Sequence, residues 1–125
     1  MKRLSRLFAL LLMASALACW AEPVAAARLA SVTGEAGDAE KRDDAEFKLS
    51  DHSEVEIQFE ITQTDKACNV IVRVHRKDGG GWLVVNNTLR TSKSASGKRS
   101  LTLPAGDYKI EVIAKHAKYD VSVDK

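Results

Sequence analysis

Three histidines, His52, His75 and His116, are the residues of this chain best suited to metal binding or to acid–base chemistry. Each lies in a separate segment, and no H-x-H or H-E-x-x-H spacing places two of them together. A zinc or copper site needs several such ligands to converge. Serine and aspartate are also present, yet no G-x-S-x-G elbow marks a nucleophile. We therefore expect no metal, no other cofactor and no enzyme activity, and we expect His75 and His116 to be solvated.

Five side chains point instead to binding. Trp82 follows three glycines, where its indole would either stack on a sugar ring or pack over the end of a hairpin. The other four occupy outward positions of alternating segments: Arg73, His75, Lys109 and Lys115. If their strands are neighbours, these four form a basic face for an anionic partner, although charged residues also protect exposed sheets from association. Interleaved aromatic residues, on which single-stranded nucleic acids stack, are missing, so we expect no nucleic-acid partner.

Charge is divided unequally along the chain. Residues 35–60 include ten acidic and three basic residues, whereas residues 61–125 include six acidic and twelve basic ones. Within one small domain, such halves either screen each other across the fold or present a basic face to an anionic protein, glycan or lipid headgroup. Both interpretations remain open at this point.

Alternation of apolar and polar residues is the main structural signal, and a period of two is typical of β-strands. It is clearest where Val55, Ile57, Phe59 and Ile61 alternate with polar residues. The other alternating segments are 47–49, 68–74, 82–85, 101–103, 108–114 and 119–123. Polar or glycine-rich turns separate them. The sequence predicts an all-β fold, an antiparallel β-sandwich of six to seven strands without a helix.

Residues 1–27 are predicted to be a signal peptide. Basic residues precede an apolar stretch, 7–20, which is too short for a membrane span. Ala25 and Ala27 fit the small-residue rule for cleavage after Ala27, and Ala18 and Ala21 are earlier alternatives. The alternative is a bacterial lipoprotein in which Cys19 is acylated. We expect a periplasmic or secreted protein with no transmembrane span, or one anchored at Cys19.

After cleavage the chain divides into two parts. Residues 28–45 mix small and charged residues without a period, which predicts a flexible charged N-terminal arm. Residues 46–125 hold the alternating segments and form the β-sandwich domain. Cys68 is then the only cysteine, and its register with the following valines predicts a buried thiol and no covalent dimer. We expect a monomer.

Two C-terminal motifs carry a family resemblance. Residues 103–112, LPAGDYKIEV, and residues 119–123, YDVSV, resemble the closing strands of the bacterial pre-peptidase C-terminal (PPC) family. The resemblance implies a jelly-roll-like sandwich that serves as a non-catalytic module, usually appended to secreted hydrolases and in some cases binding carbohydrate, protein fibres or calcium. Family members tend to have an aspartate-rich turn after the second strand. Here that stretch reads CNVIVRVHRKDGGG, which argues against a calcium role.

The sequence thus favours a small exported bacterial β-sandwich that binds a protein or glycan of the cell envelope and is not an enzyme. One alternative is an inhibitor of, or a protective factor against, an envelope enzyme. Another is a structural or surface component in which acidic and basic segments of neighbouring copies meet.

Overall fold

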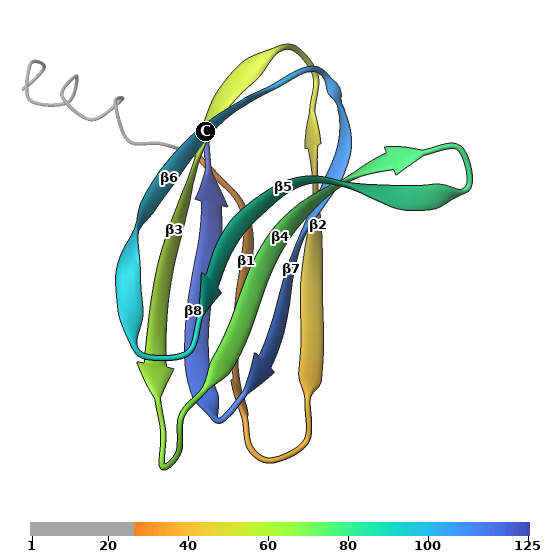
Figure 1. The fold of residues 1–125 in the computed structure, drawn as a ribbon. Coiled ribbons are helices and arrows are strands. Elements are labelled where there is room, and N and C mark those ends of the chain that lie inside the picture. The colour runs from red at the N-terminus through yellow and green to blue at the C-terminus, as the bar shows by residue number, and fades with distance from the viewer. Residues whose placement is uncertain (1–26) are drawn as a thin grey trace, which may run out of the picture.

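The structure is a computed structural model that describes residues 27–125, and every strand in it belongs to one of two antiparallel sheets (Figure 1). Sheet A has the strand order β1-β8-β3-β6 and sheet B the order β2-β7-β4-β5. The strands are β1 (Arg28–Ala36), β2 (Lys41–Leu49), β3 (Ser53–Gln63), β4 (Asn69–Asp78), β5 (Gly81–Thr91), β6 (Ala95–Leu103), β7 (Gly106–Lys115) and β8 (Ala117–Asp124). The predicted all-β sandwich is confirmed, with eight strands instead of six to seven.

The chain crosses between the sheets at every connection but one. Only β4 and β5, joined by a tight glycine turn, follow each other within the same sheet. This alternation gives two interleaved four-stranded sheets, which is the arrangement of a jelly roll. The β4–β5 hairpin extends beyond the two packed sheets, as Figure 1 shows on its right side. Gly79, with a φ of 64°, supplies the left-handed residue of the turn.

Strand alternation decides which side chains fill the space between the sheets. Val55, Ile57, Phe59 and Ile61 are all buried, as their spacing predicts. The inward residues of β4, β7 and β8 are buried against them: Val70, Val72, Val74, Tyr108, Ile110, Val112, Tyr119, Val121 and Val123. Cys68 is also buried, at 3% exposure, and its sulfur is a free thiol. The predicted register of the strand that follows it is therefore confirmed.

The predicted flexible arm is wrong. Residues 28–36 form β1, which pairs with β8 from Arg28 opposite Asp124 to Ala36 opposite Ala117. Residues 41–45 are the first half of β2, which pairs with β7. The arm looked unstructured because β1 buries only small residues, Ala30, Val32 and Ala36, which form no conspicuous apolar pattern. β1 is held by backbone hydrogen bonds to β8, which is far away in the sequence. A local pattern of residues cannot reveal such a partner.

The predicted solvation of His116 is also wrong. Its side chain is 14% exposed, and its Nε2 lies 3.0 Å from Oδ1 of Asp38. Its backbone N–H donates to the carbonyl of Gly37, and its carbonyl accepts from the N–H of Thr64. His116, with a φ of 53°, therefore connects the β7–β8 turn to two other turns at the same end of the sandwich. His52 is exposed, in the turn before β3.

A buried hydroxyl connects the two sheets. The phenol of Tyr119 on β8 donates to the carboxylate of Asp43 on β2. Burial and this hydrogen bond both raise the pKa of Tyr119 above its usual range. Gly34 makes the contact possible, because a Cβ there would lie 2.5 Å from the Tyr119 hydroxyl oxygen. The segment that the sequence assigned to an arm thus supplies two of the three residues at this junction.

The predicted signal peptide, residues 1–27, and the alternative acylation site at Cys19 lie outside the described residues, except for Ala27. Within residues 27–125, no helix is long and apolar enough to cross a membrane. β1 begins at Arg28, directly after the predicted cleavage position.

Candidate binding surface

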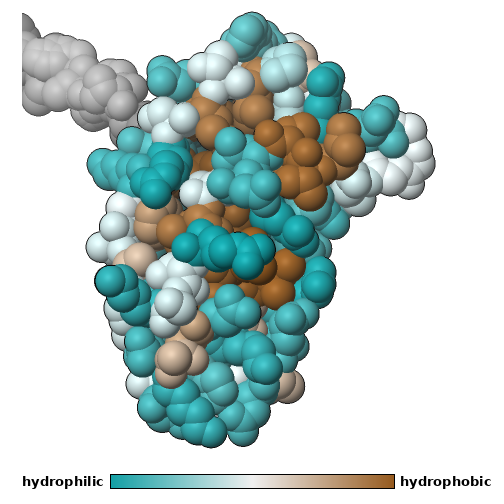
Figure 2. Space-filling model, in the orientation of Figure 1, coloured by the Kyte–Doolittle hydropathy of each residue, from teal (hydrophilic) through white to brown (hydrophobic). Residues whose placement is uncertain are grey.

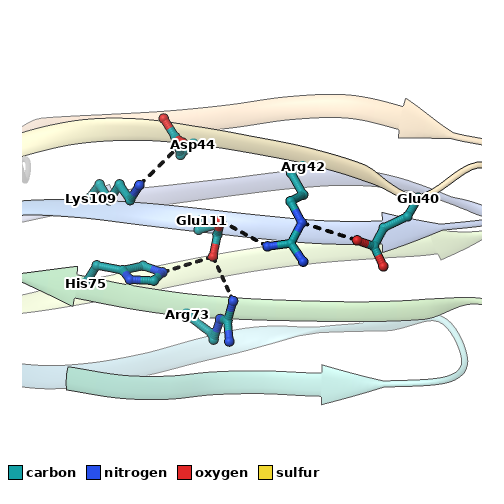
Figure 3. A network of polar contacts seen from close by, with 7 residues as sticks. All are labelled: Glu40, Arg42, Asp44, Arg73, His75, Lys109 and Glu111. Atoms are coloured by element: carbon teal, nitrogen blue, oxygen red, sulfur yellow. Dashed lines mark hydrogen bonds and ion pairs between the residues drawn. The ribbon is translucent and has the colours of Figure 1, made fainter. Parts of the chain in front are cut away.

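The outward side chains of sheet B form cross-strand rows. Arg73 on β4 lies opposite Glu111 on β7, and Glu111 lies opposite Asp44 on β2. In the next row, His75 on β4 lies opposite Lys109 on β7. The strands that carry the predicted cationic residues are therefore direct neighbours. Side chains that are opposite or diagonal across an antiparallel pair are close enough to interact. Figure 3 shows the opposite contact of Arg73 with Glu111 and the diagonal contacts of His75 with Glu111 and of Lys109 with Asp44.

Glu111 is the centre of the polar network. Its Oε1 accepts a hydrogen bond from Nη2 of Arg73 at 3.0 Å and one from Nε2 of His75 at 2.9 Å. Its Oε2 lies 3.8 Å from Nη1 of Arg42, whose Nε donates to Glu40 (Figure 3). Burial alone would raise the pKa of Glu111, but hydrogen bonds from His75 and Arg73 and their charges outweigh it and lower that pKa.

Sequence reasoning missed Glu111. Its outward position in β7 was visible, because Lys109 and Lys115 share the same alternation. What the sequence does not show is that Arg73, His75 and Arg42 surround this one carboxylate and leave it 9% exposed. The signal that would have found Glu111 is an acidic residue between two outward lysines, on a strand that lies next to other strands with cationic residues.

His75 is buried, not solvated as expected. Its exposure is 8%, and the register places its side chain between Lys109 on β7 and Val84 on β5. Nε2 carries the proton that Glu111 accepts, because a carboxylate only accepts. Nδ1 of His75 and Nε of Arg73 have no hydrogen-bond partner among the described residues. Both side chains are therefore held by Glu111 and do not offer free positive charge to a ligand.

Trp82 and Lys109 form the second contact of this surface. Nζ of Lys109 lies 4.9 Å from the centroid of the indole ring, a cation–π geometry, and 3.8 Å from Oδ2 of Asp44. Trp82 is half-buried; it comes directly after the hairpin turn, opposite Lys77, and its ring meets Lys109 of β7 on the outer face of sheet B. Lys115 is exposed at the far end of β7, opposite Asn69, and does not join the group. Four of the five predicted residues are thus brought together.

Next to Trp82, β5 exposes three large apolar side chains. Leu83 is 56% exposed, Val84 39% and Val85 40%; we call these three residues the apolar strip. Figure 2 shows hydrophobic surface where the hairpin leaves the sandwich body. The sequence indicated a strand here, but an unbroken apolar run predicts burial on both faces. It is exposed because the hairpin extends past the opposite sheet, which a single segment cannot reveal.

A shallow hollow of about 350 Å³ lies beside the apolar strip. Leu83 and Val85 line it together with residues of the hairpin's first strand and turn: Arg76, Lys77, Asp78 and Gly79. Arg76 is steadied by a hydrogen bond from Nη2 to the carbonyl of Ala105 at 3.3 Å. Apolar and cationic groups therefore adjoin in this hollow.

The outer face of sheet A has the opposite charge. Carboxylates on its central strands β3 and β8 face outward: Glu54, Glu56, Glu60, Asp120 and Asp124. Asp124 is the best held of them, because it accepts from Nε of Arg28 at 2.7 Å and from Nε2 of Gln58 at 3.1 Å. The unequal charge of the sequence thus becomes an acidic sheet on one side and a mainly cationic hairpin and sheet on the other.

Comparison with known proteins gives structural matches only. No protein-family model and no curated protein matches the sequence. A pre-peptidase C-terminal domain of a collagenase from Bacillus anthracis has 12% identity and a TM-score of 0.49, over 76% of this chain and 88% of that one. A family 16 carbohydrate-binding module has 21% identity and a TM-score of 0.46, over 76% and 71%. A protein from Sulfurospirillum deleyianum has 9% identity and a TM-score of 0.48, over 76% and 95%.

A PPC domain is therefore among the solved structures that this sandwich resembles, as the motif around Pro104 implied. One residue of that motif also has a clear structural role. Tyr108 donates a hydrogen bond to the carbonyl of Pro104 at 2.6 Å, and its ring stacks on Phe47 at 5.5 Å between centroids. The motif thus closes the β6–β7 turn over the core.

Proposed function

We propose that this chain is an exported, non-catalytic binding module that recognises an acidic protein of the cell envelope through the β4–β5 hairpin. The observation that carries the proposal is the apolar strip, three consecutive exposed apolar residues on a hairpin with cationic neighbours. Exposed apolar surface of this kind marks interaction sites, because leaving it in water is unfavourable. Arg76 and Lys77 beside it favour an acidic partner.

The polar network supports a positioning role for this surface. Glu111 holds Arg73 and His75 by two hydrogen bonds, and both side chains are largely buried. Such a network fixes β4 against β7, and β4 is the strand from which the hairpin extends. A hairpin with a fixed base loses less conformational entropy on binding, which favours affinity.

Export and the envelope location rest on the N-terminal segment. Its basic residues, short apolar stretch and Ala25-x-Ala27 pattern are typical of a signal peptide. β1 begins at Arg28, and Ala27 before it exchanges two backbone hydrogen bonds with Lys125, so strand pairing begins within one residue of the proposed cleavage site. Acylation at Cys19 is the alternative, and it would place the module at a membrane surface.

A glycan is the second candidate partner, and Trp82 favours it. The indole is partly exposed, and aromatic rings stack on the apolar faces of sugars. Lys109 lies over the ring, so a sugar would stack on the opposite side. A glycan array with wild-type protein and Trp82→Ala distinguishes this candidate, because a protein partner gives no array signal.

Capture from an envelope extract tests the proposal. The bait is the full mature chain, and the test variant carries Leu83→Ser and Val85→Ser, which remove apolar surface from exposed positions. Burying one such side chain contributes about 1.5–3 kcal/mol, so we expect capture of the partner to fall at least tenfold. Thr102→Ser, an exposed change on β6 of the other sheet, is the matched control. Equal capture by all three proteins would contradict the proposal.

A further inference from the structure

β5 is a free edge of sheet B. It pairs with β4 on one side, and within residues 27–125 no strand pairs with its other side. An edge strand presents a row of unpaired backbone N–H and C=O groups, which a further strand can pair with. Natural edges are commonly blunted by bulges, and the β4–β5 ladder has two, at Val72/Arg73 and at Val74/His75.

Trp82, Leu83 and Val84 lie beyond both bulges of β5, and Val85 is the extra residue of the second bulge. From His75 opposite Val84 to Asp78 opposite Gly81, the pairing with β4 is regular. This regular stretch includes Trp82 and Leu83, and it belongs to the hairpin that extends past the sandwich in Figure 1. The part of the edge that is least protected is therefore also the part that exposes apolar side chains.

We infer that the partner contributes an extended acidic segment that adds as a further strand along the free edge of β5 at residues 82–85. This inference rests on the proposed function and specifies how the same surface is recognised. Backbone hydrogen bonds to the edge would supply affinity, and alternate side chains would supply specificity. In the regular stretch, Leu83 would contact one face of the added strand, and Trp82 and Val84 the other.

Charge selects the occupant of this edge. Between His75 and Val85, the hairpin has two cationic residues, Arg76 and Lys77, and one acidic residue, Asp78. In the register, Arg76 lies opposite Leu83 and Lys77 opposite Trp82, so cations adjoin the strip on both faces of the hairpin. A second copy of this chain pairing through β5 would bring these cations together, which is unfavourable. A strand that alternates apolar and acidic residues fits both the strip and the charge.

The test uses the full mature chain and a synthetic peptide probe. The probe is an eight-residue peptide of alternating valine and glutamate, acetylated and amidated at its ends and labelled with fluorescein. Two further peptides have the same sequence but carry N-methyl groups on one or the other alternate set of backbone nitrogens. Alternate N–H groups of a strand point in opposite directions, so only one of the two sets faces β5. A peptide with lysine in place of glutamate is the charge control.

If a strand is added, fluorescence anisotropy should show that the unmodified peptide binds. One methylation pattern should weaken the affinity of the peptide at least tenfold, and the other should leave that affinity nearly unchanged. The lysine peptide should not bind. Backbone amides of residues 82–85 should gain protection from hydrogen exchange when the acidic peptide is bound.

Two results would overturn the inference. No strand is added if both methylated peptides bind like the unmodified one, or if saturating peptide leaves the amides of residues 82–85 unprotected from hydrogen exchange. In that case, loss of envelope capture with the Leu83→Ser/Val85→Ser variant would still support the proposed function. If those amides gain protection with rising protein concentration in the absence of peptide, the edge pairs with a second copy.

Discussion

Removing residues 28–36 is expected to unfold the domain. β1 pairs with β8 along almost its entire length, and it covers Val121 and Val123, which are both fully buried. A backbone hydrogen bond contributes about 0.5–1.5 kcal/mol net, and burial of Val32 and its neighbours adds to the loss. Together these losses approach or exceed the total stability of a small domain, about 5–15 kcal/mol.

Thermal unfolding followed by circular dichroism measures this effect on the chains 28–125 and 37–125. The matched control replaces the outward residues Thr33 and Glu35 of β1 by alanine, which keeps the strand and should change the midpoint little. If the chain 37–125 unfolds cooperatively within a few degrees of the chain 28–125, β1 is dispensable and the pairing with β8 has little energetic weight.

Replacing Glu111 by alanine is expected to have the next largest effect. The change leaves Arg73 and His75 largely buried without their acceptor. Nε of Arg73 and Nδ1 of His75 already have no hydrogen-bond partner among the described residues. Breaking a buried ion pair on one side costs about 3–5 kcal/mol, and at partly exposed Arg73 we expect the lower end of that range. Urea unfolding at pH 7 measures it. Asp44→Ala is the control, because Asp44 is half exposed and pairs with Lys109 at 3.8 Å.

The pH dependence of the same variant gives an independent check. The pKa of Glu111 is lowered in the folded protein, so its contribution to stability is complete above the unfolded value and is lost as pH falls through the folded value. The difference in unfolding free energy between wild type and Glu111→Ala should therefore shrink on acidification from neutral pH to below about pH 4. A difference that stays constant over this interval would show that Glu111 acts only by packing.

Sequence reasoning predicted the strands that bury large apolar residues in strict alternation. Val55 to Ile61 in β3 and Tyr108 to Ala114 in β7 show their inward faces directly. β1 could not be predicted in this way, since its core contacts are made by small residues and its stability comes from pairing with β8, eighty residues or more away in sequence. Local pattern contains no information on such a partner.

The grouping of the candidate contact residues was predicted only conditionally. Arg73, His75, Lys109 and Trp82 lie on adjacent strands of one sheet, which is the condition on which the predicted basic face depended. Their roles differ from the expectation, because Glu111 engages two of the cations. The apolar strip was not predicted as a site, since whether an apolar run is covered depends on the opposite sheet, and that sheet ends before the hairpin does.

Site-specific photocrosslinking tests the central claim, that the apolar strip contacts the partner, most directly. A benzophenone amino acid replaces Val84 in the full chain, and in a control chain it replaces Thr102, which is exposed on β6 of the other sheet. Illumination of cells that express either chain is followed by denaturing electrophoresis. We predict one discrete adduct from position 84 that disappears when Leu83→Ser and Val85→Ser are added, and none from position 102. An adduct from position 102 with none from position 84 would contradict the account.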